Sequence, residues 1–360
     1  MINLFVRKGS VVLVAALLAG QTGCVSIGPN QLRVSQADYA RALGEAKKRQ
    51  ILAAIVGLRF ADTPAFLTAS QIIVGYDLMA TGGPTINTRP GLGGPALQAA
   101  GALALTYASH PTFTFSPATG DAYASFIRPL PATVILPLAN SQIPIDLLLR
   151  IAAQSIGSLQ NATLLGEPNG NGSPGFFELL AVLRRLQLAG AMSIEYREVD
   201  HAPAAFLSLH AEGRDAAIVR DVAAARRLLG LPVQEAYRFV PEAQPGAAGA
   251  ASLPLATRSI LGILGNLGAE IGVSPADTAS GATKPTVQLV GGETRPTVIV
   301  HSGRAAPADA YVGIAYDHRE YWIERNDFDS KYAFSIVQDL MALAESSESS
   351  KAPVVTIPTG

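Results

Sequence analysis

Side chains able to carry out chemistry concentrate near the C-terminal end of this sequence, between residues 301 and 329. They combine imidazoles, cations, carboxylates and one indole, groups that donate and accept hydrogen bonds and pair with charged ligands. This composition predicts a polar binding cleft on a C-terminal sheet. A charged hairpin turn followed by a loop has the same composition, and both interpretations stay open. The densest part comprises His301, Arg304, Asp309, Asp317, His318, Arg319, Glu320 and Trp322.

Arg258 is a second candidate because it lies in an otherwise apolar stretch, residues 253–273, that is interrupted only by Arg258 and Glu270. A buried guanidinium needs a partner carboxylate. We expect the acids of segment 317–329 to supply that carboxylate and the pair to be structural. The complete predicted cluster, structural or ligand-binding, is Arg258, His301, Arg304, Asp317, His318, Asp327 and Asp329.

Known catalytic motifs are absent from the sequence. It contains no Gly-x-Ser-x-Gly, no Ser-x-x-Lys and no His-Glu-x-x-His. Asp200-His201 could meet His210 across a hairpin, but ordinary surface histidines are the simpler interpretation. Asn326-Asp327-x-Asp329 resembles a calcium loop without its glycine and distal glutamate, so helix capping explains it better. We predict no catalytic residue, no cofactor and no metal, and not an enzyme.

The single cysteine, Cys24, stands at the end of an N-terminal segment that has the length and layout of an export signal. The basic pair Arg7-Lys8 precedes an apolar run at 11–18 and then small residues, the layout of a secretory signal peptide. Gly23-Cys24 resembles the end of a bacterial lipobox, in which the cysteine becomes the acylated first residue. Several acyl chains, palmitate among them, would anchor it stably. The alternative is ordinary signal-peptidase cleavage that leaves a free thiol. Val25, not Asp, follows the cysteine, which resembles outer-membrane sorting signals.

Composition excludes some classes of protein. The chain has 360 residues, 27 basic against 28 acidic, and a net charge of −1. Removing Arg7 and Lys8 makes it more acidic, which argues against sequence-independent binding of nucleic acid. Beyond the export signal, no apolar stretch reaches the roughly 18 residues that a spanning helix needs.

The N-terminal part of the mature chain predicts a helix and then a long hairpin. Ser35 is a suitable N-cap, and apolar spacing continues to about Leu58. Extended runs at 66–79 and 97–115 flank a tip at 81–95 that is rich in Gly and Pro. Plain alternation makes both faces of the first run look mixed. A hairpin packed on a soluble body and a hairpin that inserts into a membrane therefore both stay open.

The remainder predicts short elements of both kinds. The apolar residues 145–159 suit a helix or a buried strand, and a helix is favoured at their start. The other expected elements are a helix from Asp121, helices at 176–188, 214–229 and 255–271, strands at 192–199, 206–210, 236–240, 297–301, 311–316 and 321–324, a helix from about Ser330 to 344, and a final strand at 353–357. The fold class is therefore α+β: a lipidated N-terminus, an N-terminal helix and long β-hairpin, and then a mixed α/β body that ends in a small antiparallel sheet with a packed C-terminal helix. The expected segments are 1–23 (signal peptide), 24–34 (tether), 35–118 (helix and hairpin), 119–240 (α/β body), 241–295 (linker-flanked helix) and 296–360 (sheet plus helix).

Several short motifs together resemble a group of uncharacterised outer-membrane lipoproteins of Gram-negative bacteria. They are Asp62-Thr63-Pro64, Pro111-Thr112-Phe113-Thr114, Thr257-Arg258-Ser259, Asp327-Phe328-Asp329-Ser330-Lys331 and Pro353-Val354-Val355-Thr356-Ile357-Pro358, with the lipobox. The resemblance spans the mature chain. It implies a compartment, but no activity, cofactor or catalytic residue.

The sequence thus predicts a periplasm-facing lipoprotein of the outer membrane, surface exposure being a further option, with a structural or partner-binding role in the cell envelope. Its expected partners are the membrane, through the lipid anchor, and a second copy of the chain or another envelope protein. One alternative is a subunit of an oligomeric outer-membrane pore or export assembly. The other is a cell-wall- or lipid-directed enzyme with an unrecognised site.

Overall fold

The computed structural model describes residues 28–81, 85–87, 98–100, 104–141, 143–162, 172–241, 252–286 and 295–346. The fold is α+β, as predicted. The chain divides into two units, Met1–Lys48 and Arg49–Gly360. The signal peptide, Cys24, most of the predicted hairpin tip (82–84 and 88–95) and the final predicted strand at 353–357 lie outside the described residues.

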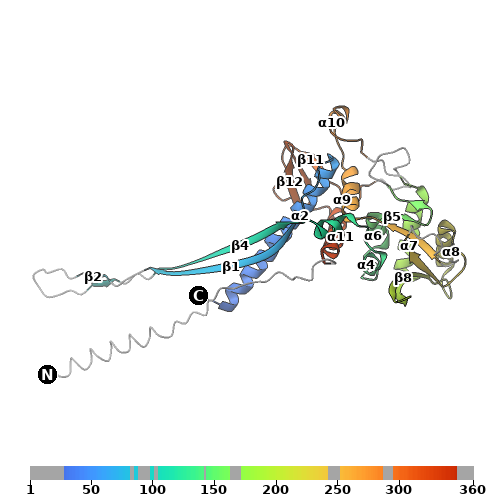
Figure 1. Ribbon diagram of the computed structural model, residues 1–360, viewed down its shortest axis with the longest axis horizontal. Coiled ribbons are helices and arrows are strands. Elements are labelled where there is room, and N and C mark those ends of the chain that lie inside the picture. Colours follow the sequence, from blue (N-terminus) through green and yellow to red (C-terminus); the bar gives the residue numbers. More distant parts are fainter. Residues whose placement is uncertain are drawn as a thin grey trace, which may run out of the picture. The chain divides into compact units, whose positions relative to one another are not determined.

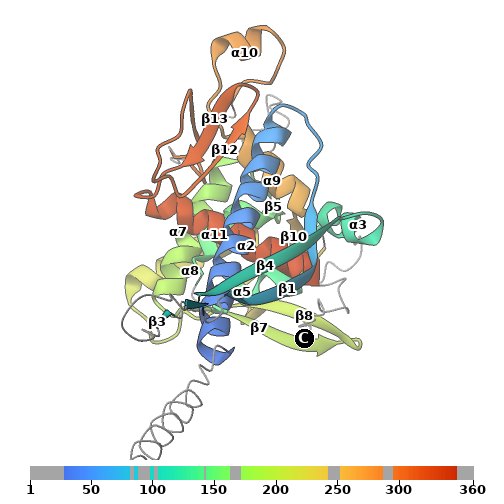
Figure 2. The ribbon, with the colours of Figure 1, turned by 90° about the vertical axis from the view of Figure 1, so that its left-hand side faces the viewer.

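Helix α2 spans Gly28–Arg59 and belongs to both units. It begins earlier than the predicted cap at Ser35, so residues 28–34 are helical where the sequence predicted a tether. In the second unit its apolar residues, among them Leu52 and Ile55, are fully buried. Helix α9 (Ile260–Ala269) lies beside it (Figure 2). A Cβ on Gly268 would lie 2.7 Å from the carbonyl oxygen of Ile55, so the two helices approach closely because position 268 lacks a side chain.

Strands β1 (Leu67–Thr81) and β4 (Ala104–Pro117) form a two-stranded antiparallel sheet, the predicted hairpin (Figure 1). The short strands β2 (Thr85–Asn87) and β3 (Gln98–Ala100) pair with one another. Pairing of β1 with β4 runs from Leu67 opposite Pro117 to Thr81 opposite Ala104. The register shifts between Ala69 and Gln71, so Ser70 is the extra residue of a β-bulge.

Four short helices follow, of which α6 confirms the helix predicted at Ile145. They are α3 (Asp121–Ile127), α4 (Ala132–Ile135), α5 (Pro137–Asn140) and α6 (Ile145–Ala152). Gln187 ties this region to helix α7 (Pro174–Leu188): its amide donates to the carbonyls of Ala139 and Ile143 and accepts from the backbone N–H of Ile145. One half-buried amide therefore satisfies three backbone groups where α5, α6 and α7 meet.

A six-stranded sheet has the order β6-β5-β10-β9-β8-β7, and β9 and β10 are its parallel pair. Its strands are β5 (Ala153–Ile156), β6 (Leu159–Gln160), β7 (Met192–Val199), β8 (Ala202–Leu209), β9 (Ala236–Val240) and β10 (Ser252–Thr257). The start of the predicted helix at 255–271 is wrong, because residues up to Thr257 belong to β10 and the helix begins at Ile260. Ser259 caps it and accepts a hydrogen bond from the N–H of Gly262.

Helices α7 and α8 (Ala216–Leu229) confirm the predicted amphipathic helices. Arg185 and Asp221 join them by a two-pronged ion pair at 2.7 and 2.9 Å. The apolar stripes of both helices belong to one core shared with the sheet. Gly230 ends α8 with φ of 64°, the left-handed conformation that glycine adopts without strain.

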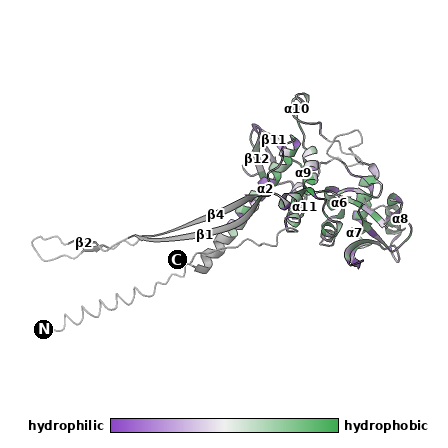
Figure 3. Ribbon diagram, in the orientation of Figure 1, coloured by the Kyte–Doolittle hydropathy of each residue, from purple (hydrophilic) through white to green (hydrophobic). Residues whose placement is uncertain are grey.

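The C-terminal region is a three-stranded antiparallel sheet of order β11-β13-β12, with α10 (Pro275–Ala279) before it and α11 (Phe328–Ser346) after it. The strands are β11 (His301–Gly303), β12 (Val312–Tyr316) and β13 (Arg319–Ile323). The strand predicted at 297–301 is wrong except at His301. Helix α11 contains hydrophobic residues that contribute to the core (Figure 3), and the ring of its fully buried Phe334 lies 6.2 Å, edge to face, from that of Tyr311.

The residues of β13 divide between the two faces of the small sheet. Successive strand residues alternate between faces, and Tyr321 and Ile323 occupy the buried face of β13. Trp322 therefore lies on the other face, where its ring stacks on His301 at 5.8 Å.

Candidate functional site

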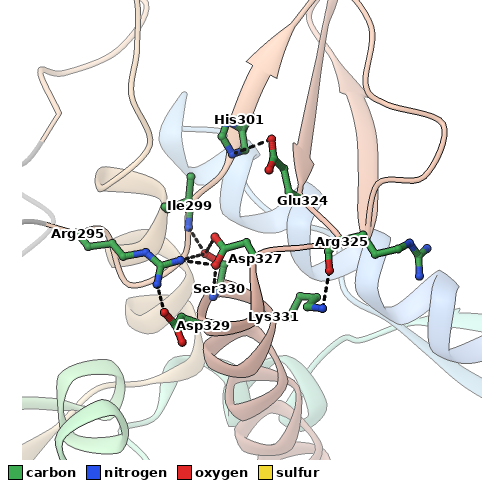
Figure 4. Close-up of polar contacts among 9 residues, drawn as sticks. All are labelled: Arg295, Ile299, His301, Glu324, Arg325, Asp327, Asp329, Ser330 and Lys331. Atoms are coloured by element: carbon green, nitrogen blue, oxygen red, sulfur yellow. Dashed lines mark hydrogen bonds and ion pairs between the residues drawn. The ribbon is translucent and has the colours of Figure 1, made fainter.

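The carboxylates at the start of α11 bind an arginine from a neighbouring loop (Figure 4). Asp327 precedes the helix and accepts from the backbone N–H of Ser330 at 3.2 Å, so it is the N-cap. The Arg295 guanidinium reaches both Asp327 and Asp329. Ser330, fully buried, accepts from the N–H of Ile299 at 2.8 Å and donates to Asp327. This network fastens the loop at 295–299 to the helix.

The electrostatics of this cap favour the ionised carboxylate. Burial by itself would raise the pKa of Asp327, but hydrogen bonds from Ser330 and Arg295 lower it below its ordinary value. The same contact with Asp327 raises the pKa of Arg295. Both carboxylate oxygens of Asp327 and one oxygen of Asp329 are thus engaged within the chain. The capping interpretation of Asp327 and Asp329 agrees with this geometry.

His301 and the hairpin turn form a separate polar group. His301 Nε2 lies 3.7 Å from a Glu324 carboxylate oxygen, and both side chains are half exposed (Figure 4). Asp317 and His318 form the two-residue turn between β12 and β13, with φ of 42° and 62°. Two positive φ values are what a tight type I′ hairpin turn requires, and Asp tolerates this conformation well. Arg304 is exposed on the connection that follows β11.

Arg258 is buried, but its predicted partners are wrong. Its guanidinium donates to the carbonyl oxygens of Arg150, at 3.0 Å, and of Ile151 and Ala162. The carboxylate that acts on it is Glu270, and not an acid of segment 317–329. Two acids of that segment, Asp327 and Asp329, pair instead with Arg295, because the N-terminus of α11 lies beside the loop at 295–299.

Glu270 and Arg258 form a buried charged centre, each 7% exposed. Burial lowers the pKa of Arg258 to about 10, and Glu270 opposes that change. Burial raises the pKa of Glu270, opposed by Arg150, by both hydrogen bonds from Thr297 and by Arg258. The centre joins α6, β10, α9 and the loop at 297, so its role is structural, as expected for Arg258.

The seven residues predicted as one cluster therefore occupy three places. Asp327 and Asp329 are at the α11 cap, Arg258 is in the core, and the others lie on or near the small sheet. His201 is also apart from His210, since residue 201 is in the β7–β8 turn whereas His210 follows the far end of β8 and contacts Ser193 at 3.3 Å. Within the described ranges, no three His, Cys, Asp or Glu side chains are grouped closely enough to hold a metal ion.

A hollow of about 380 Å³ lies beside the small sheet. It is lined by Pro307, Asp309, Ala310, Glu324, Arg325 and Asn326. Arg325 is held there by the carbonyl of Asp309, to which it donates at 2.8 Å. Lys331 donates in turn to the carbonyl of Arg325 (Figure 4). These contacts order the loop around α11, and the hollow brings together no nucleophile and base.

The β1–β4 register reveals a different candidate, an amphipathic ribbon. Residues of a strand alternate between its two faces, and residues directly opposite one another share a face. One face, here called the apolar face, contains apolar residues except for Ser109. Its members are Leu67, Ala69, Ile72, Val74, Tyr76, Leu78 and Ala80 of β1, and Leu105, Tyr107, Ser109, Pro111, Phe113, Phe115 and Pro117 of β4.

The opposite face, here called the polar face, consists mainly of small and hydroxyl-bearing residues. Its members are Thr68, Gln71, Ile73, Gly75, Asp77, Met79 and Thr81 of β1, and Ala104, Thr106, Ala108, His110, Thr112, Thr114 and Ser116 of β4. The two residues of the ribbon that can be charged near neutral pH, Asp77 and His110, are both on this face. Plain alternation along the sequence suggested that both faces are mixed, but the register separates the residue types between them. The bulge at Ser70 shifts the alternation in β1, so the residues of its apolar face have odd numbers before the bulge and even numbers after it.

Sequence reasoning missed Glu270 and Arg295 as partners and the sorting of the ribbon. Two isolated charges in the apolar stretch 253–273 were a usable signal for the Arg258–Glu270 centre, since a charge buried in a core is normally compensated. Arg295 offered none, because its partners lie 32 and 34 residues away in the chain. The ribbon needed the position of the bulge.

Comparisons with known proteins give no relative: no family model, no curated protein and no solved structure matches the chain. Membership of the lipoprotein group that the motifs resemble therefore stays a prediction. Among the described residues, no helix is both long and apolar enough to cross a membrane.

Proposed function

We propose that this protein is a lipoprotein of the outer membrane, periplasm-facing, with a structural or partner-binding role in the cell envelope. The observation that carries the proposal is Gly23-Cys24, with the chain's single cysteine directly after a basic and apolar export signal. Acylation of that residue explains both its position and its isolation, because one residue with several acyl chains is a stable membrane anchor.

The partner-binding role is supported by the ribbon. Within the described part of the chain, β1 and β4 pair with each other and with no third strand. Each strand therefore has an outer edge of backbone N–H and C=O groups available to another chain. Such edges are templates for pairing by strand addition. A long ribbon of this kind supports assembly with another copy or with an envelope partner.

Replacing the acylated residue tests the anchor. Cys24→Ser should take up no labelled palmitate and should leave the outer-membrane fraction. Val25→Asp is the matched control: by resemblance to sorting signals, it should keep the label but move to the inner membrane. A Cys24→Ser chain that is labelled and fractionates like wild type would contradict the proposal.

A further inference from the structure

The length, face composition and open edges of the β1–β4 ribbon point to a membrane partner. We propose that the ribbon inserts into the lipid bilayer, its apolar face against acyl chains and its polar face lining an aqueous path closed by further copies of this chain. This inference rests on the proposed function, because the lipid anchor brings the copies to the membrane.

Strand length is the first support. A tilted strand needs about 9–11 residues to cross the hydrocarbon layer. β1 has 15 residues and β4 has 14, and they pair from end to end. The hairpin can therefore span the layer and leave a few residue pairs for the body of the protein.

The distribution of residue types between the faces is the second support. Strands that span membranes alternate between apolar residues toward lipid and polar residues toward the interior. The apolar face carries no charged residue, and four of its residues are aromatic, Tyr76, Tyr107, Phe113 and Phe115. Asp77 and His110, costly in hydrocarbon, are both on the polar face.

The open backbone edges of the ribbon are the reason for placing further copies of the chain beside it. Backbone groups left unpaired in hydrocarbon cost several kcal/mol each, so open edges do not occur against lipid. One ribbon cannot close on itself, but the β1 edge of one copy can pair with the β4 edge of the next until the ring closes. Proline cannot donate to such a ladder, and β4 is free of proline from Ala104 to His110. We expect the contact between copies along this stretch.

Adjacent residues provide a matched pair of probes. Ile73 is on the polar face and Val74 on the apolar face, both β-branched and one residue apart. Because Cys24 is the single cysteine and is acylated under the proposed function, Ile73→Cys and Val74→Cys each give one reactive thiol. Each full-length lipidated protein is labelled with an environment-sensitive fluorophore and added to phosphatidylethanolamine–phosphatidylglycerol vesicles that contain quencher-labelled acyl chains.

Strong quenching at position 74 and little at position 73 is the expected result. Equal quenching, or none at either position, would overturn the inference. Palmitate uptake measured on the same preparations separates the two proposals. Protein that incorporates palmitate but shows no difference in quenching between positions 73 and 74 would contradict only the insertion of the ribbon. Protein that incorporates no palmitate would contradict the proposed function itself.

Conductance gives a second, independent readout. Wild-type protein extracted in detergent should form rings and conduct in planar bilayers. Val74→Lys should abolish conductance because it places a charge against lipid. Ile73→Lys should keep conductance and shift the reversal potential toward anion preference, since the added charge lines the path. A monomeric, non-conducting wild type, or equal loss in both variants, would contradict the inference.

Discussion

The hairpins β1–β4 and β12–β13 are both antiparallel strand pairs, but they differ in what covers their apolar faces. The β12–β13 hairpin gains a third strand, β11, and places Tyr321 and Ile323 in a core that it shares with α11. The β1–β4 ribbon remains two-stranded in the described chain and is much longer. A two-stranded ribbon is marginally stable in water, whereas three strands with a covered face are stable. The β12–β13 hairpin is thus covered within the molecule, whereas we propose that a surface outside the molecule covers the β1–β4 ribbon.

The polar groups differ in the same way. Near the small sheet, Asp327, Asp329 and Ser330 are engaged by Arg295 or the adjacent backbone. Their role is to fix loops and caps. On the ribbon, polar and apolar residue types are instead separated over the entire length of two strands. The charged residues near the small sheet therefore serve the chain's own loops and caps, and the proposal of a membrane partner rests on the two faces of the ribbon instead.

The largest effect should follow from opening the core beneath the small sheet. Phe334→Ala removes a fully buried ring, and we expect a loss of about 3–5 kcal/mol in the free energy of unfolding. Phe328→Ala is the matched control, since Phe328 is in the same helix and 69% exposed. It should change stability by about 0.5 kcal/mol or less. Chemical denaturation measures both, and equal effects would break the comparison.

Removing the buried cation should have the next largest effect. Arg258→Met leaves Glu270 in the core without this guanidinium, for which we expect about 3 kcal/mol, the lower end for a broken buried pair, because the hydrogen bonds from Thr297 remain. Glu270 has a raised folded pKa, so the folded state binds its proton more readily than the unfolded chain. The deficit should therefore shrink as pH falls. A deficit that does not change with pH would contradict this role for Glu270.

A smaller loss should follow from removing the cap of α11. Asp327→Ala should cost about 1–2 kcal/mol, because it removes the N-cap and a contact with Arg295. The folded pKa of Asp327 is lowered, so its stabilisation is complete above the unfolded pKa and is lost as pH falls through the folded value. The difference between wild type and variant should thus narrow below about pH 4. Asp329→Ala, at an exposed residue, should cost less in the same denaturation experiment.

The smallest effect on stability is expected on the ribbon, and its size tests most directly whether the ribbon differs from the β12–β13 hairpin in being uncovered in water. Val74→Lys and Ile73→Lys should each change the unfolding free energy in water by about 0.5 kcal/mol or less, the usual range outside a core. The two variants should differ only in the presence of lipid. A loss in water at Val74 comparable to that of Phe334→Ala would show that the ribbon is completed by its own protein.

Local patterns predicted much of the fold. The periodicity of residues 176–188 predicted α7, and alternation at 192–199 and 236–240 predicted β7 and β9. Asp327 was identifiable as a cap because side-chain oxygens at a helix start satisfy N–H groups that have no partner in the helix. Patterns failed where neighbours in space decide. The residue types at 255–257 suit a helix as well as a strand, and pairing with β5 makes them a strand.

The sequence by itself determined the α+β class, most helices and strands, the cap at Asp327 and the prediction of an acylated Cys24. These depend on interactions within a few residues, or on a short motif. Only the tertiary structure decided that Arg258 interacts with Glu270, that Arg295 pairs with the carboxylates at the start of α11, and that the two faces of the ribbon differ in polarity. Ion pairs join segments distant in the chain, and the faces of a ribbon follow from its register. One extra residue at Ser70 changes which residues share a face, and no local pattern marks where a partner strand accommodates it.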